Sequence, residues 1–120
     1  MSDESKLTYI ASPVPELPVM DVERAQQHYR DKLGFTIGWL YPDKTIGAVS
    51  RPDAVIFFRK REQPFEPQAH WVFAPDIHAT YQELKSLGAN IVDPLEKKPW
   101  GLTQFTVEDL DGNQFNFHHD

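Results

Sequence analysis

Two stretches of the chain repeat apolar residues with the spacing of an amphipathic helix. The apolar positions of the first stretch are Val22, Ala25, Tyr29 and Leu33, and those of the second are Ile77, Tyr81, Leu84 and Leu87. Asp21 and Asp76 precede these stretches, and aspartate favours the N-cap of a helix. Gly34 and Gly88 follow them, and glycine favours the left-handed position that ends a helix. The match in start, length and end indicates an internal repeat.

Short β-prone segments surround both predicted helices. The segments before the helices are 14–20 and 70–74, and three follow each helix, at 35–41, 46–50 and 54–59 and at 90–92, 102–108 and 114–118. Simple alternation would place Phe35, Ile37, Trp39 and Tyr41 on one face of their strand. The Asp-Gly pair at 111–112 predicts a hairpin turn. The pattern therefore predicts an α+β fold of two βαβββ modules.

The two modules form a single predicted domain over residues 1–120. They cover about residues 12–60 and 68–119, and the polar segment 61–67 between them contains two prolines, as joints between modules often do. A chain of 120 residues fits one domain of ordinary size.

Composition narrows the function classes. The formal net charge is −6, which argues against nucleic-acid binding because the phosphate backbone is also negative. The absence of cysteine excludes disulfides and thiolate zinc sites. The chain starts with polar residues and has no apolar run near the roughly 20 residues that a membrane span needs. We therefore expect a cytoplasmic protein with no membrane partner.

A series of short motifs adds a family resemblance. They include Val14-Pro15-Glu16-Leu17, Asp31-Lys32-Leu33-Gly34-Phe35, Trp71-Val72-Phe73, Pro99-Trp100-Gly101, Gln104-Phe105 and Gly112-Asn113. In this order they resemble the vicinal-oxygen-chelate superfamily, also called the glyoxalase/bleomycin-resistance/dioxygenase group. Within it the chain is most similar to bleomycin-resistance binding proteins. The resemblance implies a curved mixed sheet with a cleft, and a homodimer with two clefts at its interface. The prolines at 13, 15 and 18 would suit a hinge for exchange of N-terminal strands between chains.

The resemblance also allows the metal ligands of related enzymes to be carried over position by position. The usual histidine of the first strand falls on Val14, and the usual glutamate near the end of the chain falls on Asn116. His70 is near the third position, but alternation with Trp71 turns it to the opposite face. We therefore expect no metal, no cofactor and no catalytic residues. A site of Glu16, His118 and a further residue remains an alternative.

The expected ligand-binding residues are aromatic or lie beside aromatic residues. They are Trp39, Tyr41, Trp71, Phe73, Trp100, Asn116 and His118. Indole and phenyl rings stack on flat ligands and attract cations. For Trp71, packing in the core is an equally good interpretation.

The resemblance implies a non-catalytic protein that sequesters a bleomycin-type glycopeptide or other aromatic, cationic compound, and so confers antibiotic resistance. One alternative is a metal-dependent glyoxalase or dioxygenase-type lyase. Another is a binding module for an unrelated aromatic metabolite. Two departures weaken the assignment of a bleomycin-type ligand and leave a binder of another aromatic metabolite open. Thr45 replaces an aromatic residue of the bleomycin-resistance pattern, and four cations near the expected rim would oppose a cationic ligand: Lys44, Arg59, Lys97 and Lys98.

Overall fold

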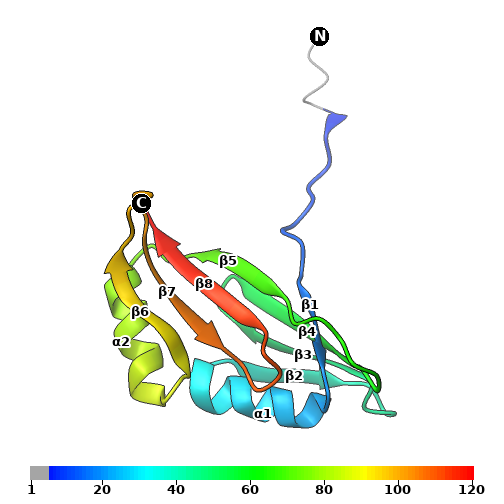
Figure 1. Cartoon of the computed structure of the whole chain (residues 1–120). Helices are drawn as coiled ribbons and strands as arrows, with labels where there is room; N and C mark the ends of the chain where they lie inside the picture. Colours follow the sequence, from blue (N-terminus) through cyan, green and yellow to red (C-terminus); the bar gives the residue numbers. More distant parts are fainter. Residues whose placement is uncertain (1–5) are drawn as a thin grey trace.

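The computed structural model describes residues 6–120 and shows two consecutive βαβββ modules (Figure 1). Residues 1–5, on which the expected location partly rests, lie outside this range. The first module contains β1 (Glu16–Val19), α1 (Val22–Leu33), β2 (Thr36–Leu40), β3 (Ile46–Arg51) and β4 (Ala54–Lys60). The second contains β5 (Ala69–Phe73), α2 (Ile77–Leu87), β6 (Ile91–Lys97), β7 (Thr103–Glu108) and β8 (Gln114–His119). The predicted α+β class and element order are confirmed.

Both helices begin and end where the sequence predicts. The Asp21 carboxylate accepts a hydrogen bond from the Arg24 backbone N–H at 3.0 Å, and the Asp76 carboxylate accepts one from Ala79 N–H at 3.1 Å. Gly34 and Gly88 have φ angles of +74° and +86°. A side chain is disfavoured in this left-handed region, so glycine ends each helix.

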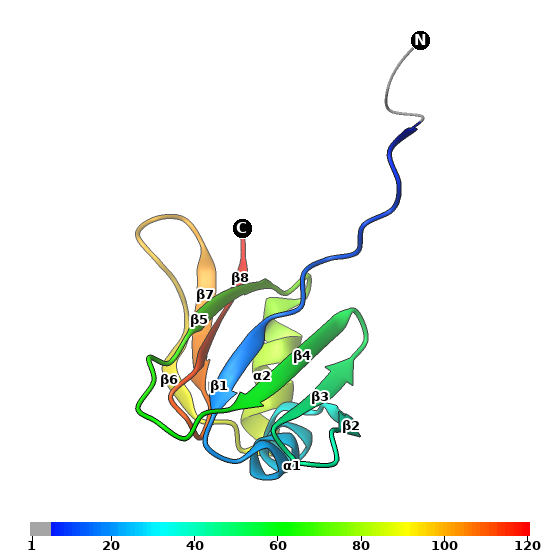
Figure 2. The ribbon, with the colours of Figure 1, turned by 90° about the vertical axis from the view of Figure 1, so that its right-hand side faces the viewer.

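The eight strands form two mixed four-stranded sheets, which do not join into one. Sheet A has the order β1-β4-β3-β2, and sheet B has the order β5-β8-β7-β6. The β1–β4 and β5–β8 pairs are parallel, and the other pairs are antiparallel. In Figure 1, α1 lies beside β2 and α2 lies beside β6. Figure 2 shows β1 and β4 of sheet A in front of α2.

One face of each sheet contributes to a shared hydrophobic core with the helices. Its fully buried members include Leu17 and Phe58 from sheet A, Tyr29 and Leu84 from the helices, and Phe105 from sheet B. Strand residues that alternate with these core residues point away from the helices. We call the two surfaces that they form the outer face of sheet A and the outer face of sheet B.

The simple alternation expected for residues 35–41 is wrong because β2 contains a bulge. Ile37 pairs with Val49 and Leu40 pairs with Gly47, so three residues along β2 match two along β3. The extra residue turns Trp39 away from the side of Ile37. The Trp39 ring instead lies 5.2 Å from the Phe57 ring, on the outer face of sheet A.

β6 is also irregular, and it is longer than the segment 90–92 expected from the sequence. It contains Pro94, and its register with β7 shifts on both sides of Asp93. Proline cannot donate to a strand ladder, which confines it to edge strands and bulges. β6 is an edge strand of sheet B, so Pro94 breaks no central hydrogen bond.

The hairpin turn between β7 and β8 joins the two modules. Asn113 is completely buried; its amide donates to Pro18 O of the first module at 2.9 Å and accepts from the Gln68 backbone N–H at 2.9 Å. The Tyr29 hydroxyl of α1 donates to Asp109 at 2.6 Å. Met20 N–H donates to Asp111 at 3.0 Å. We call this set of contacts the module junction.

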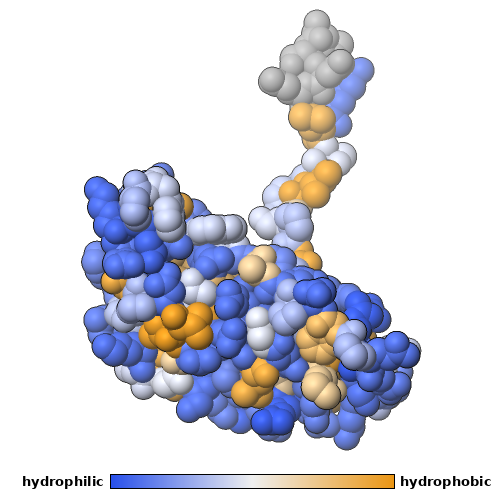
Figure 3. Space-filling view, in the orientation of Figure 1, coloured by the Kyte–Doolittle hydropathy of each residue, from blue (hydrophilic) through white to orange (hydrophobic). Residues whose placement is uncertain are grey.

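The residues before β1 extend away from the rest of the chain (Figures 1 and 2). Leu7, Tyr9 and Ile10 in this arm are 77%, 90% and 87% exposed. Figure 3 shows hydrophobic side chains along the arm, clear of the main body. Isolated exposed apolar residues are common, but three within four positions leave an apolar strip without cover.

Within residues 6–120, no helix has both the length and the apolar character needed to cross a membrane.

Candidate functional site

The outer face of sheet A carries an ion pair beside two aromatic rings. Glu16 on β1 is the register partner of Phe57 on β4, and Arg59 lies two residues farther along β4 on the same face. The Arg59 guanidinium contacts both oxygens of the Glu16 carboxylate, at 2.7 and 3.1 Å. Chiefly because of this hydrogen bond, the pKa of Glu16 lies below its ordinary value. Phe57 and Trp39 lie next to the pair with their rings nearly edge to face.

The outer face of sheet B carries two exposed aromatic residues around a histidine. Trp71 and Phe73 come from β5, and their register partners on β8 are Asn116 and His118. The His118 ring lies 5.7 Å from each of the two aromatic rings, and both contacts are nearly edge to face. Trp71 is 57% exposed and Phe73 52%. Core packing therefore does not explain Trp71, and its exposed ring is available to a partner.

Trp100 is tied to the same sheet from the loop between β6 and β7. The residue is 63% exposed, yet its indole N–H donates a hydrogen bond to the Gln104 side chain at 2.8 Å. Gln104 is the register partner of His118, which in turn neighbours Phe73. A row of side chains therefore crosses sheet B from β7 to β5. The next row runs from Thr106 through Asn116 to Trp71.

Three of the four cations that would oppose a cationic ligand are already paired with carboxylates. Arg59 is bound to Glu16, and Lys44 lies 3.0 Å from Glu23. The Lys98 ammonium contacts both Asp93 and Glu96. Their charges are thus largely compensated, which removes much of the electrostatic objection drawn from the sequence.

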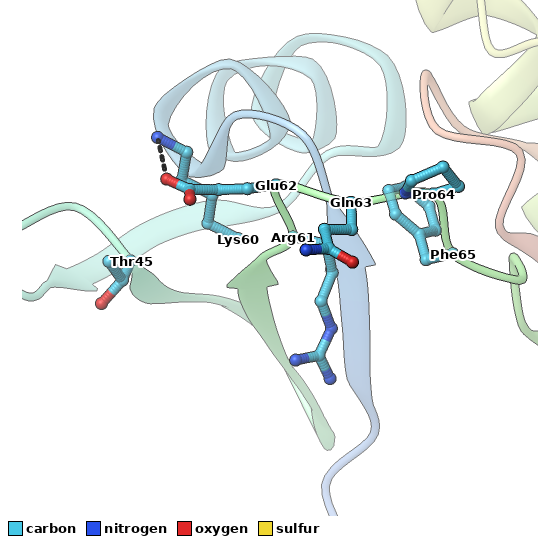
Figure 4. A pocket seen from close by; sticks show the side chains of 7 residues that line it. All are labelled: Thr45, Lys60, Arg61, Glu62, Gln63, Pro64 and Phe65. Carbon is cyan, nitrogen blue, oxygen red and sulfur yellow. Dashed lines mark ion pairs between the residues drawn. The ribbon is translucent and has the colours of Figure 1, made fainter.

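The aromatic positions lie on open sheet faces and not in a walled cavity of the single chain. A hollow of about 570 Å³ lies instead at the end of β4 and the start of the linker (Figure 4). Its lining residues are Thr45, Lys60, Arg61, Glu62, Gln63, Pro64 and Phe65. Five of its seven lining residues are polar or charged, and Lys60 and Glu62 lie 3.9 Å apart in it. None of the predicted ligand-binding residues lines it.

A model of the Glyoxalase/Bleomycin resistance protein/Dioxygenase superfamily matches residues 6–117. The chain belongs to this superfamily. No curated protein sequence matches it at a significant level. The match covers both modules, and the predicted superfamily membership is confirmed.

Several solved structures share the fold of this chain. A bleomycin resistance determinant encoded on transposon Tn5 has a TM-score of 0.79 at 20% identity, covering 92% of this chain and 98% of its own. A bleomycin-binding protein from Streptomyces verticillus, complexed with copper(II)-bleomycin, has a TM-score of 0.74 at 21% identity, with coverages of 95% and 98%. TioX from Micromonospora sp. ML1 has a TM-score of 0.73 at 24% identity, with coverages of 91% and 98%. At these identities the likeness shows the fold alone.

The metal site of related superfamily enzymes does not fit the residues of this member. The Val14 side chain has no atom that could ligate a metal. The Asn116 side-chain oxygen already accepts a hydrogen bond from the Thr106 hydroxyl at 2.6 Å. His70 lies on the core side of β5, as alternation predicts, where its ring stacks on Phe115 and contacts Gln68. Within residues 6–120, no group of three His, Cys, Asp or Glu side chains is arranged to hold a metal ion.

The two named residues of the alternative metal site, Glu16 and His118, lie on different sheets. Glu16 lies on sheet A and is bound to Arg59, whereas His118 lies on sheet B between two aromatic rings.

The seven predicted ligand-binding residues fall into two groups in this superfamily member. Trp71, Phe73, Trp100, Asn116 and His118 gather on sheet B, whereas Trp39 lies on sheet A and Tyr41 just beyond the end of β2. Their role in binding remains a prediction. The sequence reasoning missed Phe57 and Gln104 as candidates. Alternation was the available signal, because both residues alternate with core residues of their strands.

Proposed function

We propose that this superfamily member binds an aromatic small molecule and sequesters it without chemical change. The observation that carries the proposal is the outer face of sheet B, where Trp71, Phe73 and Trp100 are each more than half exposed around His118. Large exposed aromatic groups are costly in water and mark binding surfaces. The poor fit to the superfamily's metal ligands supports binding without catalysis.

Bleomycin-type glycopeptides are the ligands to test first. Two of the structural relatives are named for binding this compound. The acidic net charge and the carboxylate-paired cations of this chain are compatible with a ligand that has both aromatic and cationic parts. Sequestration in the cytoplasm would keep such a drug from its target and so confer resistance.

The proposal includes a homodimer in which a second copy supplies the other wall of each cleft. Each outer face is open on a single chain, and the apolar arm of Leu7, Tyr9 and Ile10 extends beyond it. Pairing of chains would cover both features. The double variant Tyr9→Ser/Ile10→Ser should shift the mass measured by analytical ultracentrifugation from dimer toward monomer. If the wild-type protein remained monomeric at high concentration, the proposed homodimer would be contradicted.

Titration with bleomycin tests the binding proposal directly. Stacking against Trp71 and Trp100 should quench tryptophan fluorescence, and binding to the folded state must raise the melting temperature. Neither change at saturating drug would remove bleomycin as the ligand, and the same assay with other aromatic compounds would then test the broader claim. Stoichiometric nickel, zinc, iron or manganese in the purified protein would favour the metal-dependent lyase instead.

A further inference from the structure

The side-chain amide of Gln104 is oriented by its neighbour in a way that leaves its donor group unused. An indole N–H can only donate, so the Gln104 side chain turns its oxygen toward Trp100, at 2.8 Å. The amide nitrogen then points elsewhere. Within residues 6–120 it has no hydrogen-bond partner and, unlike His118 Nδ1, it is not a buried unpaired atom, so it is open to solvent.

Asn116 repeats this arrangement in the adjacent row of sheet B. Its side-chain oxygen accepts from the Thr106 hydroxyl at 2.6 Å. Its amide nitrogen likewise has no hydrogen-bond partner in the described part of the chain. Two amide donors are therefore presented on neighbouring strands, and each is fixed by a bond to its own oxygen.

His118 lies beside both amides and provides a third donor. It is the register partner of Gln104 and lies two residues from Asn116 on the same face of β8. Its Nδ1 atom is buried and has no hydrogen-bond partner within residues 6–120. A proton on Nδ1 would be a buried donor without an acceptor, which favours the neutral tautomer whose proton is on Nε2, where it can be donated to a ligand.

Aromatic side chains frame this group of donors. The Trp71 and Phe73 rings lie nearly edge to face with the His118 ring, and Trp100 is bound to Gln104. A flat ligand that stacks on these rings would take the donors out of water. If its edge offered no acceptors, the donors would be left unsatisfied, which is unfavourable.

We propose that the outer face of sheet B selects aromatic ligands whose edge carries hydrogen-bond acceptors, such as carbonyl or carboxylate oxygens, through Gln104, Asn116 and His118. This inference rests on the proposed function and adds the chemistry of the ligand edge. A cationic group elsewhere on the same ligand is compatible with it. A ligand whose only polar edge group is a donor is not.

Two probes with the same ring system separate this inference from the proposed function. The acceptor probe is 2-naphthoate and the donor probe is 2-naphthylmethylammonium, and both are titrated into the full chain by isothermal calorimetry alongside bleomycin. The net charge of −6 works against the anion. We nevertheless expect naphthoate to bind at least about tenfold more tightly, because only it can accept from the three donors.

The variant Gln104→Glu replaces the amide donor with a carboxylate oxygen and adds one negative charge. The carboxylate still accepts from Trp100, but an acceptor oxygen replaces the amide nitrogen. Gln82→Glu is the control, because Gln82 is exposed on α2 and has no side-chain hydrogen bond in the described part of the chain, so it adds the same charge far from sheet B. Gln104→Glu should reverse the preference between the probes, and Gln82→Glu should leave it unchanged. Asn116→Asp repeats the test at the second donor if Gln104→Glu lowers the melting temperature strongly.

The possible results bear separately on acceptor selection by the three donors and on the proposed aromatic binding site. Equal or tighter binding of the ammonium probe to the wild-type protein would overturn acceptor selection, while its binding would still support an aromatic site. A preference for naphthoate that survives both Gln104→Glu and Asn116→Asp would overturn the assignment to these donors. No binding of bleomycin or of either probe would overturn both the donor assignment and the proposed aromatic site.

Discussion

The Tyr29→Phe variant tests whether the module junction stabilises the fold. The Tyr29 hydroxyl donates to the Asp109 carboxylate at 2.6 Å, and both residues are buried. The substitution removes this bond and keeps the ring. The edge-to-face contacts of the ring with Phe35, Phe58 and Phe115 should therefore persist. A change in the stability of the variant therefore reflects the loss of the hydrogen bond and not a change in ring packing.

The expected loss in the free energy of unfolding depends on the hydrogen bonds that Asp109 retains. Hydrogen bonds to charged groups contribute about 1.5–3 kcal/mol. After the substitution, Asp109 still accepts from Asp111 N–H at 2.8 Å, from Asn113 N–H at 2.9 Å and from the Asn113 amide at 3.1 Å. Because three donors remain, the loss should lie near the lower end, at about 2 kcal/mol.

Urea denaturation measures this loss. With a slope of about 2 kcal/mol per molar urea, the midpoint should fall by about 1 M. Tyr81→Phe is the matched control, because the Tyr81 ring packs on Phe105 while its hydroxyl has no hydrogen-bond partner among residues 6–120. That variant should lose less than about 0.5 kcal/mol. Equal midpoints for the two variants would refute the reasoning.

The same bond predicts a dependence on alkaline pH. Burial, and then the neighbouring Asp109, raise the pKa of Tyr29 well above its ordinary value of 10.0. A raised folded-state pKa means that the stabilisation is complete below the unfolded value and is lost as pH rises above it. The wild-type urea midpoint should therefore fall above about pH 10 more steeply than that of Tyr29→Phe.

Three further variants test other parts of the account. Trp100→Ala should weaken bleomycin binding by roughly 1–3 kcal/mol and leave the melting temperature nearly unchanged, and the reverse result would make Trp100 a packing residue. Gly34→Ala places a side chain at φ +74°, with Glu83 3.0 Å from the new Cβ, and should lower stability by about 1–2 kcal/mol in thermal denaturation. Burial lowers the pKa of His28 below 6.5, so the wild-type urea midpoint should fall as pH drops below that value, and His28→Gln should flatten this part of the profile. An unchanged profile in His28→Gln would contradict that assignment.

The sequence predicted the features that depend on neighbouring residues. Asp21 and Gly34 set the ends of α1 through contacts within a single turn, so a local pattern is sufficient to find them. Alternation likewise separated His70 from Trp71 on β5, because that strand keeps a regular register with β8.

The features that depend on distant parts of the chain were not predicted. The bulge in β2 arises where its register is matched to β3, and alternation within β2 cannot reveal it. Asp109 and Asn113 were read only as part of a turn, although their partners Tyr29 and Pro18 lie 80 and 95 residues away. Alternation could have placed Gln104 on the outer face, but its pairing with His118 on the adjacent strand β8 could not be read from its own strand.

The two modules show which positions are constrained by packing and which are free to acquire a binding role. Leu17 paired with Phe58 in sheet A corresponds to Val72 paired with Phe117 in sheet B, and all four side chains are apolar because they face one core. The outward pairs that alternate with them differ: Glu16 pairs with Phe57, and Trp71 pairs with Asn116.

This difference bears on how a ligand could use both faces. Large exposed aromatic rings do not stabilise a surface that only contacts water. Their presence on the outer faces of both sheets therefore favours a binding role for each face. Sheet A offers an ion pair beside Phe57, whereas sheet B offers donors among three rings. No single outer face carries both sets of groups. A ligand that uses both chemistries at once would therefore have to contact both outer faces, either of one chain or of two paired copies.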